Sequence, residues 1–247
     1  MEKKSKSGNS IKFGSLKLEQ CIFEVRCYNR QVFLAVMPDF WDAVEKRLNK
    51  PIIYRIQDTA STTVVEKSIQ LSIEQERFSV AAFSPQKSLE KFIEITSDFY
   101  GIVREILRME KIIRIGFRLI YVLDFEDSES AIEAFMSLPF IGVPDNLSLS
   151  KSGKPMMPTY YLGWQDGKKA IVYRMKGNFS TLTVDLPLQL SLSGEYPERI
   201  EKAFNQFVFD VDVHITEPVS PEEFLPKEWL GQAYEIVNAD GITFFGD

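Results

Sequence analysis

The first half of the chain switches between stretches with apolar residues at every second position and stretches with helical spacing. The two-residue period predicts strands over residues 16–28, 63–73, 78–83 and 111–125. Helical spacing predicts amphipathic helices over residues 38–50 and 85–107. The order strand, helix, strand, strand, helix, strand is that of a ferredoxin-like β-α-β-β-α-β unit.

The second half repeats this logic less regularly. The strands expected from its pattern cover residues 160–164, 170–175, 179–190 and 207–216. The helices expected are residues 128–136 capped by Asp127, residues 197–204 beginning at Pro197, and a segment opened by the capping box at Ser220. We therefore predict an α+β fold of two ferredoxin-like halves, with antiparallel sheets covered by helices on one face. The expected organisation is a disordered tail (1–14), a first half (15–126) and a second half (127–247).

Composition places the chain among ordinary folded proteins that need no disulfide. Hydrophobic residues make up 45% of it and include 19 Phe, enough aromatic area for a sizeable core. Cys21 and Cys27 lie six positions apart on one expected strand, about 20 Å, which is too far for a disulfide. No apolar leader or membrane-length apolar stretch is present, so we expect a cytoplasmic protein. The net charge of −6 argues against binding to nucleic acid or to an anionic membrane.

One candidate site lies on the polar face of the strand over residues 111–125. Arg114 and Arg118 share this face with Gly116, and in a ferredoxin-like sheet Glu24 and Arg26 lie on the neighbouring strand. Two arginines can grip a phosphate or carboxylate through paired hydrogen bonds. The alternative is a cross-strand ladder of salt bridges with Glu24, which we favour. Gly116 leaves room for another backbone to approach closely.

A second candidate site lies on the late strand. Asp210, Asp212 and His214 alternate with apolar residues and therefore share one face. Carboxylate and imidazole groups are metal ligands, but neighbours on one strand face lie about 7 Å apart. A metal site would need ligands from another element. The favoured interpretation is a polar face exposed to solvent or to the other half of the protein.

The sequence contains no catalytic or cofactor signature. His214 is the only histidine, and there is no Gly-x-Ser-x-Gly elbow, dinucleotide fingerprint or zinc-binding cysteine cluster. We therefore expect no cofactor and lean against an enzyme. The Pro-, Ser- and Gly-rich stretch from Pro139 to Pro158 predicts a long loop of the kind that is often functional.

Three short segments resemble a family of sporadically distributed prokaryotic proteins of similar length, for which no activity is established. They are Phe23-Glu24-Val25-Arg26, Arg114-Ile115-Gly116-Phe117-Arg118 and Asp210-Val211-Asp212. The family pattern continues Arg-x-Gly-x-Arg with Tyr and Asn, where this chain has Leu119 and Tyr121. The resemblance implies a patchily inherited accessory protein.

Three functional hypotheses follow, in order of preference. The first is a non-enzymatic interaction or regulatory module, of accessory or defence type, that works with a protein partner or as a homo-oligomer. The second is a small-ligand or nucleotide-binding module that uses Arg114 and Arg118, with Glu24 and Arg26 beside them. The third is a metal-assisted hydrolase built on Asp210, Asp212 and His214.

Overall fold

The computed structural model describes residues 11–29, 33–49, 51–56, 60–66, 68–85, 89–142, 158–185 and 199–247. These residues form one nine-stranded sheet with the order β2-β3-β4-β5-β1-β6-β9-β8-β7, in which all neighbouring strands are antiparallel. The strands are β1 (Lys17–Asn29), β2 (Tyr54–Ile56), β3 (Ala60–Glu66), β4 (Ile69–Glu74), β5 (Arg77–Phe83), β6 (Met109–Asp124), β7 (Thr159–Asp166), β8 (Lys169–Asp185) and β9 (Arg199–Ile215). The helices are η1 (Phe13–Ser15), α1 (Phe33–Leu48), α2 (Leu89–Leu107), α3 (Ser128–Met136) and α5 (Pro226–Phe245).

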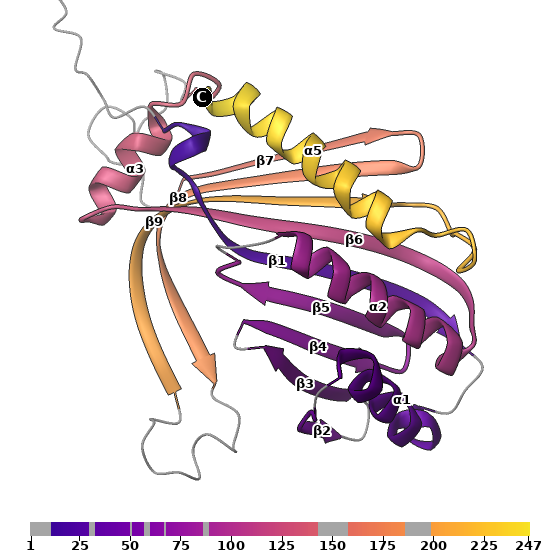
Figure 1. Ribbon diagram of the computed structural model, residues 1–247. Coiled ribbons are helices and arrows are strands. Elements are labelled where there is room, and N and C mark those ends of the chain that lie inside the picture. Colours follow the sequence, from indigo (N-terminus) through magenta and orange to yellow (C-terminus); the bar gives the residue numbers. More distant parts are fainter. Residues whose placement is uncertain are drawn as a thin grey trace, which may run out of the picture.

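The α-helices cover one face of the sheet (Figure 1). Phe78 on β5 packs edge-on against Phe99 of α2, and Phe23 on β1 packs against Trp229 of α5. Phe40 of α1 also meets Phe99, and α3 packs on β8 and β9. None of the helices in the described ranges combines the length and the apolar character needed to cross a membrane. The α+β class with helices on one face is as predicted.

The division into two ferredoxin-like halves is not confirmed. The first range does place β4, β5, β1 and β6 side by side, with α1 and α2 between them in the chain. However, β6 continues directly into the second range, because it pairs with β9 from Ile115↔Ile215 to Asp124↔Gln206. The strands of both ranges therefore belong to one sheet rather than two.

Three predictions of individual elements were wrong in detail. The strands expected separately over residues 170–175 and from residue 179 onward are one continuous strand, β8. The stretch over residues 63–73 is a hairpin of β3 and β4 rather than one strand. Ile200 and Phe204 lie in β9, where we expected a helix. A spacing of four residues puts two side chains on one face of a helix and also on one face of a strand, so this pair does not distinguish the two. Residues 186–190 of the expected strand, and Pro197 itself, lie outside the described residues.

The first and the last described segments of the chain pack against each other. Ile11 is buried. The ring of Phe13 packs directly on Gly241 of α5, where an added Cβ would lie only 2.3 Å from Cε2 of the ring. Residues 11–13, which we expected in the tail, therefore take part in the packing of the described chain. At the other end, α5 begins at Pro226 rather than at Ser220. Residues 1–10 and 143–157, the latter forming most of the expected loop, lie outside the described residues.

The two thiols are buried in the sheet and are not joined to each other. Burial raises the pKa of both Cys21 and Cys27 to about 12, and Glu76 adds to the effect at Cys27. The thiolate is the reactive form, so its population in the folded protein is very small at neutral or mildly alkaline pH.

We predict that neither thiol of the folded protein reacts with a chromogenic disulfide reagent at about pH 8, near the usual pKa of cysteine. Both should react once the chain is unfolded in denaturant, because unfolding removes the burial that raises their pKa. Absorbance of the released thiolate, followed with and without denaturant, measures this. Rapid reaction in native buffer would contradict the buried placement.

Candidate functional site

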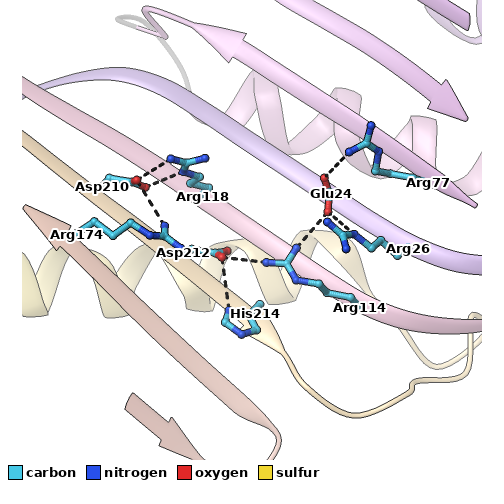
Figure 2. A network of polar contacts seen from close by, with 9 residues as sticks. All are labelled: Glu24, Arg26, Arg77, Arg114, Arg118, Arg174, Asp210, Asp212 and His214. Atoms are coloured by element: carbon cyan, nitrogen blue, oxygen red, sulfur yellow. Dashed lines mark hydrogen bonds and ion pairs between the residues drawn. The ribbon is translucent and has the colours of Figure 1, made fainter. Parts of the chain in front are cut away.

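The face of the sheet opposite the helices carries a network of charged side chains. On β9, Val211 and Val213 are buried in the core, so the alternation of the strand turns Asp210, Asp212 and His214 to the other face. Residues from β5, β1, β6 and β8 meet them there, as Figure 2 shows. This face therefore gathers the candidates that the sequence placed on separate strands.

Asp210 is gripped by two arginines from the strands on either side. Arg118 of β6 donates from Nε to Oδ1 and from Nη2 to Oδ2, each at 2.7 Å. Arg174 of β8 approaches Oδ2 with its Nη1 at 3.5 Å. The paired hydrogen bonds of Arg118 are the strongest form of an arginine–carboxylate contact. Hydrogen bonding to Asp210 also raises the pKa of Arg118, so its guanidinium stays charged.

Arg114 connects the other two carboxylates of the network. Its Nη1 donates to Oε1 of Glu24 at 3.2 Å and its Nη2 to Oδ2 of Asp212 at 2.9 Å. Glu24 on β1 also accepts from Nε of Arg26 at 2.9 Å, and Nη1 of Arg77 lies 3.6 Å away. One guanidinium thus spans from β1 to β9 across its own strand.

Gly116 makes this crossing possible. In the register of the sheet it lies between Glu24 on β1 and His214 on β9, and Arg114 is two positions away on the same face. A Cβ on Gly116 would come within 2.6 Å of Nη1 of Arg114, closer than two such atoms can approach. The close approach expected at this glycine is therefore made by the arginine side chain and not by another backbone.

The network has two layers, with the carboxylates nearer to the sheet and the guanidinium groups nearer to solvent. The side chains of Asp210, Asp212 and Glu24 are 8, 12 and 20% exposed, whereas those of the five arginines are 28–50% exposed. Five arginines contact three carboxylates, and Glu74 adds a fourth carboxylate beside Arg77. The chain as a whole carries −6, yet this face presents guanidinium groups to solvent.

The arrangement gives little support to a metal site. Both aspartates already accept from arginines, and a cation would have to displace those positive groups. Nδ1 of His214 lies 3.7 Å from Oδ2 of Asp212 and has no hydrogen-bond partner among the described residues. Among these residues, no three His, Cys, Asp or Glu side chains are grouped so that they could hold an ion. The metal-site hypothesis stays a prediction, with this geometry against it.

All seven residues proposed from the sequence lie in the network, but Arg77, Arg174 and the carboxylate beside Arg77, Glu74, were missed. Arg77 begins β5 and pairs with Arg26 in register, while Arg174 on β8 lies opposite Asp210. The alternation of each strand indicates which face these arginines occupy. Their neighbours depend on the order of β8, β9 and β6 in the sheet, which alternation does not supply.

No protein-family model matches the chain, and no curated protein is significantly similar to it. The fold and the site define an α+β protein with one sheet face covered by helices and an arginine-rich face on which none of the described helices lies, which we call the uncovered face.

We predict that Gly116→Ala destabilises the protein by about 1–3 kcal/mol, since the new methyl displaces Arg114 from two poorly exposed carboxylates. In an Arg114→Ala background the same change meets no guanidinium. There it should be neutral or stabilising, because alanine in a strand is favoured over glycine by about 0.5–1 kcal/mol. Urea unfolding of the four proteins measures the difference. An equal cost in both backgrounds would show that Gly116 serves another purpose.

Proposed function

We propose that this chain is a non-enzymatic interaction or regulatory module whose uncovered sheet face binds an acidic segment of another protein. The observation that carries the proposal is the layering of the network, in which poorly exposed carboxylates lie beneath more exposed arginines. The network spans five adjacent strands, β5, β1, β6, β9 and β8. An extended segment lying across them would meet guanidinium groups along its length.

Several guanidinium N–H groups remain available for such a partner. Arg118 uses Nε and Nη2 for Asp210, and no described residue accepts from its Nη1. Arg26, whose side chain is 50% exposed, donates from Nε to Glu24, and no described residue accepts from its other nitrogens. Arginine forks match carboxylates in geometry as well as charge, which favours an acidic partner.

The same geometry ranks the small-ligand hypothesis second. Arg114 already lies between Glu24 and Asp212, and Arg118 is already bound to Asp210. A phosphate held by these two arginines alone would have to compete with the carboxylates of the chain itself. A broad surface contact leaves these ion pairs intact.

Three narrower ideas remain proposals. One is that the first range is a ferredoxin-like unit, which the strand order β4-β5-β1-β6 supports. The accessory or defence-type role rests on the sequence resemblance alone. The metal-assisted hydrolase rests on the residue types of Asp210, Asp212 and His214.

The binding test uses a labelled oligoglutamate peptide of about eight residues. An extended chain rises about 3.4 Å per residue, so this length crosses five strands that together span about 20 Å. Fluorescence anisotropy should show binding that weakens as salt is raised. Arg26→Ala should weaken it about fivefold, the equivalent of about 1 kcal/mol for an exposed ion pair.

Arg47→Ala is the matched control, because Arg47 is an exposed arginine of the helix layer that pairs with Asp98 at 2.6 Å. This variant should bind the peptide as the unmodified protein does. Failure to bind oligoglutamate, or equal weakening by both variants, would contradict the proposal. Tighter binding of an oligothymidylate of the same length would indicate a nucleic-acid partner instead.

A further inference from the structure

The strand β7 forms a long edge of the sheet. It pairs with β8 on one side from Thr159↔Lys176 to Asp166↔Lys169, and no other described strand pairs with its outer side. The opposite edge, β2, has only the three residues Tyr54–Ile56. An eight-residue edge leaves a row of backbone N–H and C=O groups that can pair with another strand.

The composition of β7 lacks the usual protection of an edge. Its sequence, Thr-Tyr-Tyr-Leu-Gly-Trp-Gln-Asp, contains no lysine, arginine or proline, the residues that commonly block edge pairing. Tyr161 and Trp164 are 64 and 67% exposed, more than the other aromatic side chains recorded as exposed among the described residues. The most exposed aromatic groups of the described chain thus lie on the strand whose edge is open.

The sequence of β7 is complementary to itself when two copies run antiparallel. A two-fold axis perpendicular to the sheet puts the helix-covered faces of both copies on one side of the joined sheet. Residues directly opposite each other then point to the same face, so their residue numbers are either both odd or both even. Centred on Leu162, this pairing sets Leu162 against Leu162 of the second copy. It sets Tyr160 against the second copy's Trp164, and Tyr161 against its Gly163. Aromatic pairs, and an aromatic ring placed over a glycine, are favourable across strands.

Charge favours a second copy of the chain at this edge. The chain carries a net charge of −6, and net charge of one sign opposes the approach of two copies. Residues 159–165 are uncharged, and in the register centred on Leu162 the single acid, Asp166, lies opposite Pro158 of the other copy. The acidic chain thus has a neutral edge at which two copies can meet without direct repulsion.

We propose that β7 is a homodimer interface, at which two copies join their sheets through antiparallel β7–β7 pairing centred on Leu162. Both uncovered faces then lie on the same side of one continuous sheet. Tyr161 already lies beneath the guanidinium of Arg174, 5.8 Å from ring centroid to Cζ. The arginine-rich faces of the two copies therefore become parts of one surface, with the two β7 strands between them.

Light scattering coupled to size-exclusion chromatography of the full chain tests the interface. The unmodified protein should have the mass of a dimer. The double variant Tyr161→Lys, Trp164→Lys should have the mass of a monomer with unchanged circular dichroism, since lysines then protect the edge. Tyr28→Lys is the control, because Tyr28 is also an exposed aromatic but lies on β1, inside the sheet. That variant should remain a dimer.

A cysteine at the centre tests the register. Residues directly opposite have Cα atoms about 4.5–5.5 Å apart, within the range of a disulfide. Leu162→Cys should therefore give a covalent dimer on mild oxidation. The two native cysteines, Cys21 and Cys27, should not form crosslinks, because both are buried. Gly163→Cys should not, since two residues 163 lie diagonally, about 7–8 Å apart.

A monomeric unmodified protein would overturn the proposal. So would a dimer that survives the double lysine variant, or one in which Leu162→Cys fails to crosslink. These outcomes are independent of oligoglutamate binding, which tests the uncovered face separately.

Discussion

The uncovered face of the sheet is organised by the need to neutralise two poorly exposed aspartates. Asp210 and Asp212 have neighbours on β9 that belong to the core, so their own positions on the other face follow from the strand. A carboxylate with so little solvent is costly unless it is paired and hydrogen-bonded. Arg118 and Arg114 supply that pairing from β6. The charge network therefore gives both aspartates the partners that their burial calls for, and its arginines lie nearer to solvent than its carboxylates.

The rest of the fold fixes the positions that this pairing needs. The continuous pairing of β6 with β9 brings Arg114 and Arg118 close to the two aspartates. Because Gly116 has no side chain, Arg114 can lie across its own strand at that position. On the opposite face, packing of α2 and α5 on Phe78 and Phe23 keeps the central strands aligned. Together these features leave one face apolar and covered and the other charged and uncovered.

The sequence predicted the parts of this structure that depend on local pattern. Alternation placed Asp210 and Asp212 on one face, and Asp127 was correctly identified as the cap of α3, accepting from the backbone N–H of Ser130. It did not predict that β6 and β9 are neighbours, because strand order depends on packing between distant segments. For the same reason the sequence did not predict the contact between Arg174 on β8 and Asp210 on β9. Ile200 was misassigned because a four-residue spacing is common to helix and strand.

The most direct test of the central claim is a double-mutant cycle between Arg118 and Asp210, measured by urea unfolding. Arg118→Ala leaves a poorly exposed carboxylate with only a distant partner in Arg174, whereas Asp210→Ala leaves a half-exposed guanidinium. We expect the first change to cost more stability, and a coupling free energy of about 2 kcal/mol between the two sites. Costs that add without coupling would show that the pair is an incidental surface contact, and the account of the uncovered face would be wrong.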